Sequence, residues 1–304
     1  DTRTFYILPK INPDGSDAYL RKPGDPVDPS LKKVDDDGDG LLDEDGPEDL
    51  NGDGIISQMR VRDEKGPFKT NPKDPRLMVQ RRFDEKGEWR VVGPEGLDND
   101  KDGRTNEDLP GGSRSVTNRN YPAYWAPEWV QSGSGGYPLS EPEAKAQVDF
   151  ILAHPNIMGA QSFHNNGGMI LRGPGAEQTG EYPRSDVRAY DELGQQGERI
   201  LPYYRYIIIW SGLYTVHGGV TDWGNDGLGI LSFSNELWNG GQYFNSPELK
   251  EQQKDPDSPI APDVANYFFN DYLEFGDQLI PWAEFDHPDF GKVEMGGWKQ
   301  TFGR

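Results

Sequence analysis

Hydrophobic and polar positions along the chain form patterns that predict most of its regular structure. Apolar residues between 144 and 152 recur at helical spacing, and Pro155 ends this predicted helix. Runs at 157–163 and 228–237 have the length and apolar character of buried strands, and 186–200 has helical composition. The alternation of strands and helices predicts an α/β fold, with a mixed, largely parallel twisted sheet flanked by helices.

Weaker patterns mark the two ends of the chain and the start of the predicted helix. Residues 4–9 predict a buried strand that ends at Pro9. Ser140-Glu141-Pro142-Glu143 is a capping-box sequence, in which Ser140 accepts from backbone N–H groups and Glu143 reaches back. After residue 239 the chain is irregular and aromatic-rich, with a helix predicted around 263–275.

Residues 22–112 differ in character from the rest of the chain. They are polar and rich in Asp, Gly and Pro, with only short strand-like pieces such as 89–92. A structureless loop of this length is unusual inside a compact domain. We therefore predict a single domain over 1–304 that contains an acidic insertion held by metal ions, without a large core of its own.

Three segments of this insertion alternate oxygen-bearing side chains with other residues and then place a glycine. Alternate oxygen ligands let a tight loop wrap a cation, and glycine permits the sharp turn. None of the segments has Glu at its twelfth position, so they resemble the calcium loops of dockerins and thrombospondin-type repeats more than standard EF-hands. The predicted calcium ligands are Asp35, Asp37, Asp39, Asp43, Asp49, Asn51, Asp53, Asp98, Asp100 and Asp102.

The alternative for these segments is a solvated acidic loop without a cation. Ten acidic residues lie between Asp35 and Asp53, however, with no Lys or Arg among them to offset their repulsion. Calcium loops of this kind bind weakly and need millimolar calcium. That requirement favours an extracellular or periplasmic location.

Net charge and cysteine content exclude several classes of protein. A formal net charge of -21 repels phosphate backbones and anionic membrane surfaces, so nucleic acid is not an expected partner. The absence of cysteine excludes disulfides, Cys-ligated zinc and thiol catalysis. No apolar run approaches 18 residues, so no membrane span is expected.

Two residues at predicted strand ends are candidates for chemistry. His164 follows the strand at 157–163, where a lone histidine is more often a hydrogen-bonded structural residue than a metal ligand. Glu236 lies between Phe233 and Leu237, where a carboxylate is costly to bury unless it is paired, functional or reaches solvent. Ligands of α/β sheets bind at the C-terminal ends of strands, which is where both residues fall.

Taken in order, several motifs resemble the zinc carboxypeptidases of the A and B type. They are Asn12-Pro13-Asp14-Gly15, Asn118-Arg119-Asn120, the Ser-Glu-Pro-Glu segment, His164, and the stretch from Tyr214 through Gly218-Gly219 and Asp222-Trp223 to Glu236. The last stretch matches the family without a gap. The resemblance covers about 4–15 and 116–238, leaving the insertion and the tail outside it.

The resemblance implies a role for each matched residue. His164 would be the third ligand of a catalytic zinc ion, with a histidine and a glutamate from an upstream His-x-x-Glu motif. Glu236 would be the general base, and Asn118 with Arg119 would hold the terminal carboxylate of the substrate. Tyr214 would close over the bound residue. For the arginine that stabilises the oxyanion, Arg60 is the first choice and Arg21 the second.

Two departures from the family pattern accompany these roles. Only eleven residues precede Asn12, and none of the four histidines has Glu three positions later, so we expect the N-terminal part of the fold to be missing from this stretch. Val116 stands where the family usually has Asp supporting a zinc ligand.

Two functions remain open at this stage. The first is an exported zinc carboxypeptidase acting on peptides or peptidoglycan peptides. The second is a calcium-stabilised, non-catalytic module that binds peptide C-termini with a degenerate peptidase fold. An upstream His-x-x-Glu motif would favour the enzyme.

Overall fold

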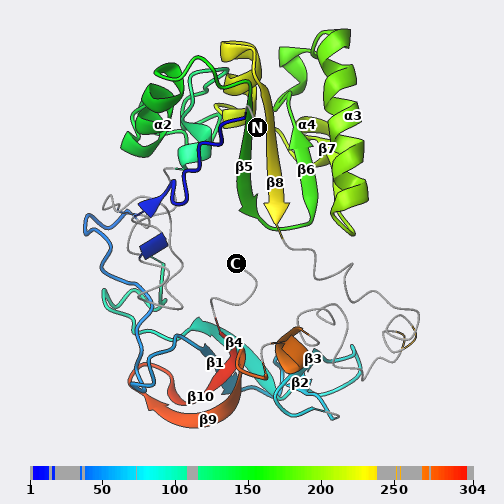
Figure 1. The fold of residues 1–304 in the computed structure, drawn as a ribbon. Helices are drawn as coiled ribbons and strands as arrows, with labels where there is room; N and C mark the ends of the chain where they lie inside the picture. The colour runs from blue at the N-terminus through cyan, green and yellow to red at the C-terminus, as the bar shows by residue number, and fades with distance from the viewer. Residues whose placement is uncertain are drawn as a thin grey trace. The chain divides into compact units, whose positions relative to one another are not determined.

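The chain forms two compact units in the computed structural model (Figure 1). The structure describes residues 3–13, 16–17, 35, 38–72, 74–107, 116–237, 251, 254, 269–273 and 275–299. Unit 1 comprises Asp1–Ala18, Val27–Lys32 and Gly111–Trp238, and unit 2 comprises Tyr19–Pro26, Lys33–Pro110 and Asn239–Arg304.

Unit 1 contains a four-stranded mixed sheet with the order β5-β8-β6-β7. β5 pairs with β8 and β6 pairs with β7 in parallel, whereas β6 and β8 are antiparallel. This confirms the prediction of a mixed, largely parallel sheet for this part of the chain. The strands are β5 (Gly159–Asn165), β6 (Met169–Arg172), β7 (Arg205–Ile208) and β8 (Leu231–Leu237).

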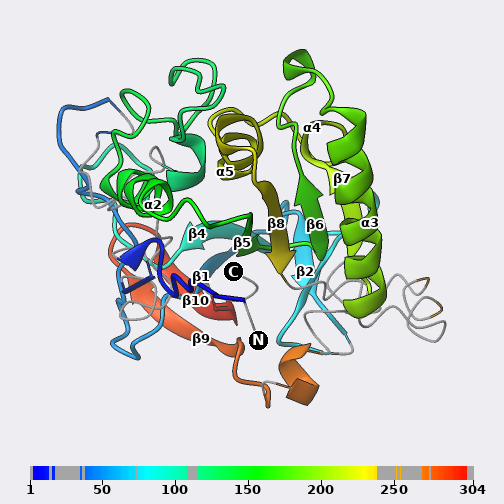
Figure 2. The ribbon, with the colours of Figure 1, turned by 45° about the horizontal axis from the view of Figure 1, so that its top comes forward.

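Helices contact this sheet, and the longest of them lies where helical composition predicted it. α3 (Arg184–Ile200) contacts β6 and β7, and the short α5 (Val220–Asp222) contacts β8 (Figure 2). α2 (Pro142–Leu152) contributes Ala144 and Val148 to a buried cluster with Tyr121 and Trp223. The remaining short elements are η1 (Thr117–Arg119), η2 (Glu177–Thr179), α4 (Ile209–Gly212) and the π-helical η3 (Trp223–Gly227).

Two local predictions for unit 1 are wrong. Glu141, not Ser140, is the N-cap of α2, and it makes no side-chain cap hydrogen bond. Pro142 begins the helix instead, where its fixed φ suits the first turn and its missing N–H costs nothing. Residues 4–9 form no strand, and Phe5 and Ile7 are 82% and 80% exposed, because no described strand pairs with them.

Unit 2 contains a six-stranded sheet with the order β3-β2-β4-β1-β10-β9, in which every pair is antiparallel. Met59 from β1 packs with Val293 and Met295 from β10 in its buried core. The strands are β1 (Gln58–Arg62), β2 (Phe68–Thr70), β3 (Met78–Gln80), β4 (Trp89–Pro94), β9 (Leu279–His287) and β10 (Gly291–Trp298).

The sequence predicts a single domain with an insertion at 22–112 that has no large core of its own. The structure has a second compact unit instead. Its strand β1 pairs with β10, and β10 pairs with β9, both from the C-terminal region that was expected to be irregular. A short strand becomes stable when partners from elsewhere in the chain complete its sheet, and local periodicity does not reveal those partners. Most of the helix predicted at 263–275 lies outside the described residues. The described part of this range contains the π-helical η4 (Phe269–Leu273).

Candidate functional site

The pairing of β5 with β8 places His164 beside Glu236. The two strands are parallel, and His164 is the register partner of Glu236. Both residues lie at the C-terminal ends of their strands. Residues in register on adjacent strands project to the same side of a sheet, so a histidine and a carboxylate become neighbours.

The Asn118 side chain contacts both His164 and the backbone of Val220. Its Oδ1 accepts a hydrogen bond from the Val220 backbone N–H at 2.9 Å, so its amide nitrogen faces the opposite way. That nitrogen lies 3.0 Å from Nε2 of His164. Since the amide donates, Nε2 acts as the acceptor and carries no proton in this arrangement.

Arg119 extends this chain of contacts to Tyr214. One guanidinium nitrogen donates to the Asn118 carbonyl at 2.9 Å, and another donates to the Tyr214 hydroxyl at 3.4 Å. The guanidinium carbon lies 5.9 Å from the centre of the Tyr214 ring. Tyr214 is 51% exposed.

Burial shifts the proton affinity of the two titratable groups in opposite directions. It lowers the pKa of His164, and the positive charge of Arg119 adds to this shift. It raises the pKa of Glu236, which Arg119 partly opposes. His164 is therefore kept neutral, and Glu236 becomes a stronger base than a solvated glutamate.

A neutral imidazole fits one position of a catalytic zinc site, which takes three protein ligands and a water molecule. Within the described ranges, groups of three carboxylate or histidine side chains close enough to share an ion occur only among Asp45, Asp98, Asp100, Asp102 and Glu107. His164 can thus supply one zinc ligand, and the described residues around it do not complete the set.

Two buried polar residues that the sequence analysis did not single out hold this region in shape. Asn120 donates to the carbonyls of Ser134 at 2.6 Å and Tyr137 at 3.0 Å, which fixes the segment after η1. Asp222 accepts from the Gly175 backbone N–H at 3.1 and 3.0 Å and from the Tyr182 hydroxyl at 3.2 Å. Both residues belong to motifs that match the family, so the resemblance could have identified them.

Arg60, the predicted oxyanion arginine, belongs to unit 2 and is engaged there. Its guanidinium donates to Glu294 Oε2 at 3.0 and 2.6 Å and lies 3.8 and 3.9 Å from the Trp89 and Trp282 rings. The residue is 4% exposed. These contacts give Arg60 a role in the core of unit 2, where its guanidinium pairs with Glu294. Arg21 lies outside the described residues.

The predicted calcium loops share one pattern of backbone hydrogen bonds. The first aspartate of each loop accepts, through Oδ2, from the glycine N–H five positions later, at 3.0 Å for Asp35, 2.7 Å for Asp49 and 3.0 Å for Asp98. The aspartate four positions after it accepts from the N–H two positions further on, at 2.6, 2.9 and 2.8 Å. Asp37 lies outside the described residues.

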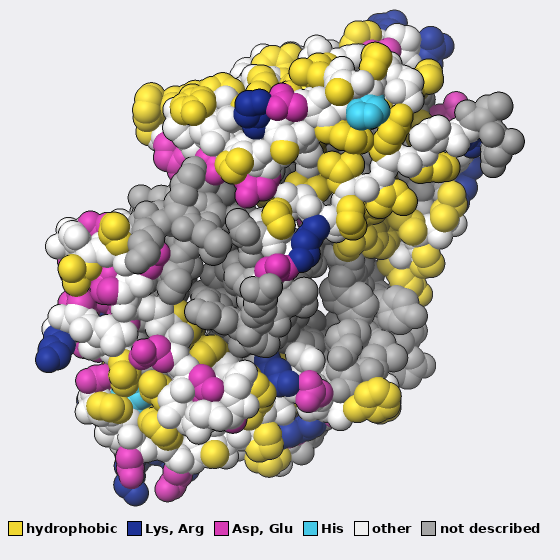
Figure 3. All heavy atoms as spheres, turned by 60° about the vertical axis from the view of Figure 1, so that its left-hand side comes forward, with side chains coloured by type: hydrophobic (Ala, Val, Ile, Leu, Met, Phe, Trp, Pro, Cys, Tyr) yellow, Lys and Arg dark blue, Asp and Glu magenta, His cyan; other side chains and the backbone are white. Residues whose placement is uncertain are grey.

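These contacts curl each loop around its own carboxylates, as its sequence predicts. Figure 3 shows acidic side chains spread over the face it draws, without a single acidic patch.

Comparison with known proteins points to one family. A family model described as zinc carboxypeptidase matches residues 104–258. A search of curated proteins finds no match.

Among the helices described, none is long and apolar enough to cross a membrane.

Several solved structures are similar to part of this chain, and three of them are as follows. Thrombin-activatable fibrinolysis inhibitor is 28% identical over 50% of this chain and 40% of its own, with a TM-score of 0.37. Its bovine form, in complex with tick carboxypeptidase inhibitor, is 27% identical over 52% and 60%, with a TM-score of 0.37. Carboxypeptidase A from Helicoverpa armigera is 28% identical over 40% and 32%, with a TM-score of 0.34. The chain thus spans between 32% and 60% of the length of these proteins.

Proposed function

Because the chain belongs to the zinc carboxypeptidase family, we propose that it forms part of an enzyme that removes the C-terminal residue of a peptide. The contacts of unit 1 support this proposal. A continuous series of contacts runs from Tyr214 through Arg119 and Asn118 to His164, which is in register with Glu236. A cation for a carboxylate, a neutral metal ligand and a base therefore come together from separate parts of unit 1.

Arg119 and Asn118 bind the terminal carboxylate of the substrate. A guanidinium matches a carboxylate with two parallel N–H donors, and the contact with the Asn118 carbonyl holds the Arg119 side chain in place beforehand. The Tyr214 hydroxyl then follows the substrate inward from its exposed position. This gives the site its preference for a free chain end over an internal peptide bond.

Glu236 removes a proton from the attacking water and passes it to the leaving amine. Its raised pKa suits both steps, because the carboxylate accepts a proton readily and releases it again. His164, kept neutral, is one ligand of the zinc ion. Bound zinc supplies a water of lowered pKa and polarises the scissile carbonyl.

The proposal extends to the substrate, to the ion bound by the aspartate loops and to the site of action. The substrate is a peptide or a peptidoglycan peptide, and the aspartate loops bind calcium that stabilises unit 2. The loops need millimolar calcium, which supports an extracellular or periplasmic site of action.

The test is the Glu236→Gln variant in an active preparation of the protein. The amide occupies nearly the same volume but cannot accept the proton, so kcat should fall by roughly 100- to 10,000-fold with little change in bound zinc. Glu192→Gln, an exposed change on α3, serves as the control and should retain activity. Near-normal kcat in Glu236→Gln would remove this residue from the mechanism.

The alternative of a non-catalytic binding module gains support from the carboxylate-binding pair. Arg119 and Asn118 are positioned by contacts within the described residues, independently of any metal. Binding and turnover should therefore be measured separately, with a peptide and its C-terminal amide. Binding of the free acid without cleavage, in zinc-loaded protein, would establish the module and overturn the enzyme.

A further inference from the structure

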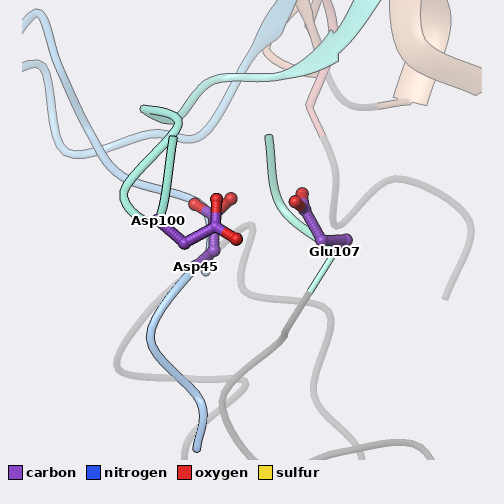
Figure 4. A group of neighbouring side chains, drawn as sticks. All are labelled: Asp45, Asp100 and Glu107. Carbon is purple, nitrogen blue, oxygen red and sulfur yellow. The ribbon is translucent and has the colours of Figure 1, made fainter. Parts of the chain in front are cut away.

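Three carboxylates from separate stretches of unit 2 meet at one point. Asp45 follows the first aspartate loop, Asp100 belongs to the third, and Glu107 comes after it (Figure 4). One carboxylate oxygen of each lies within 4.8 Å of those of the other two. Asp100 also belongs to a second group with Asp98 and Asp102.

The buried carboxylates have oxygens that nothing in the described chain satisfies. Asp45 is 0% exposed, and its Oδ2 has no hydrogen-bond partner. Its Oδ1 accepts a long bond of 3.3 Å from the Asn99 side chain, and the backbone N–H groups of Asn99 and Asn106 also favour its charged form. Both carboxylate oxygens of Glu107 are buried and without a partner. Among the described Lys and Arg side chains, none pairs with Asp45, Asp100 or Glu107. A buried carboxylate without a donor or a cation is strongly unfavourable.

We propose that Asp45, Asp100 and Glu107 bind one calcium ion, which joins the chain after the first aspartate loop to the third loop. This inference deepens the proposed calcium binding and differs from it in a specific way. The sequence assigned each ion to ligands of a single loop and did not include Asp45 or Glu107 among them. The structure assigns both to an ion shared with Asp100.

The ligand geometry fits calcium. Calcium–oxygen distances are about 2.3–2.6 Å, so two ligands of one ion lie up to roughly 4.6–5.2 Å apart. The three carboxylate oxygens lie within 4.8 Å of one another, which is close enough for one ion to contact all of them. All three ligands are hard oxygens with no imidazole or thiolate, which favours calcium over zinc.

The experiment measures calcium binding and thermal stability of the full chain after chelator treatment. Asp45→Asn and Glu107→Gln each remove one charged ligand while keeping the side-chain volume. Glu64→Gln is the matched control, because Glu64 is exposed in the same unit and pairs only with Lys86 on the surface. Calcium chloride alone is the titrant, followed by isothermal titration calorimetry.

We expect both variants to lose one bound calcium ion, or to bind it with at least about tenfold lower affinity. Stability should change in opposite directions with and without calcium. In the chelated protein each amide relieves repulsion between buried carboxylates, so the variant Tm should exceed that of the wild type. In saturating calcium the order should reverse, whereas Glu64→Gln should follow the wild type in both conditions.

The other outcomes separate two kinds of failure. If wild-type protein binds no calcium at all, the loop proposal fails together with this one. If the wild type binds calcium and both variants retain its full stoichiometry and affinity, only the shared site is overturned. A variant Tm lowered equally with and without calcium would show that the carboxylates act as hydrogen-bonding groups that share a proton, and would also overturn it.

Discussion

The two units of this chain differ in how they satisfy their buried polar groups. In the described part of unit 1, only Gln147 and Asn235 have buried side-chain atoms without a hydrogen-bond partner. Unit 2 has buried carboxylate oxygens without a partner on Asp45, Glu48, Asp98 and Glu107. The unpartnered side-chain atoms described in unit 1 thus belong to neutral amides, whereas several of those in unit 2 belong to carboxylates.

Glu95 shows that unit 2 is able to satisfy a buried carboxylate where its fold requires one. It is 0% exposed and accepts from the N–H groups of Leu50 and Asn51 through Oε1, and from the N–H and hydroxyl of Ser57 through Oε2. These four bonds, at 2.9–3.2 Å, hold the second aspartate loop against β4. The unsatisfied oxygens of Asp45 and Glu107 are therefore a local property, not a general one of the unit.

Calcium removal should have the largest effect, because it should destabilise unit 2 without destabilising unit 1. Each saturated site contributes roughly 2.7 kcal/mol at a hundredfold excess of calcium over Kd, and the loops provide several sites. A calcium-selective chelator that leaves zinc bound should lower the Tm of unit 2. Amide hydrogen exchange should rise in 38–107 and 279–298 but not in α2, α3 or β8. An equal rise in both units would remove the distinction between them.

A second test uses Asp222, the buried carboxylate of unit 1 with a strongly raised pKa. Burial raises its pKa to about 6 from an ordinary value of 3.8, so the folded protein holds a proton that the unfolded chain releases between these values. Stability from this group therefore falls as pH rises from about 4 to 6, by roughly 2–3 kcal/mol.

Asp222→Asn should abolish this pH dependence without adding a charge. Denaturant unfolding at several pH values should show the variant gaining stability relative to the wild type as pH rises through this window. Asp149→Asn, an exposed change on α2, should leave the pH dependence unaltered. If wild type and Asp222→Asn run parallel from pH 4 to 7, Asp222 does not titrate in this way.

The smallest expected effect is that of Glu95→Gln in unit 2. The amide turns one hydrogen-bond acceptor into a donor that faces N–H groups, which should cost about 1–3 kcal/mol. Unlike the change caused by a chelator, this loss should be the same with and without calcium. Equilibrium unfolding in both conditions, with Glu64→Gln as the control, measures it. A loss seen only with calcium would place Glu95 among the groups that depend on the ion.

Local pattern in the sequence predicted those features that depend on near neighbours. Helical spacing located α2, helical composition located α3, and apolar runs located β5 and β8, because these signals are carried by neighbouring residues. The spacing of aspartate or asparagine at alternate positions before a glycine predicted three tight loops, and all three share one pattern of internal hydrogen bonds. The ordered motifs identified the family, which the comparison confirmed.

Only the tertiary structure decided which distant segments meet. The pairing of β1 with β10 joins residues more than 200 positions apart, and it supplied the core and the Arg60–Glu294 contact that sequence reasoning missed. The contact of Asn118 with His164 and the meeting of Asp45 with Glu107 likewise depend on how whole elements pack. Such contacts are selected by burial and charge balance over the complete fold, so no spacing within a single segment encodes them.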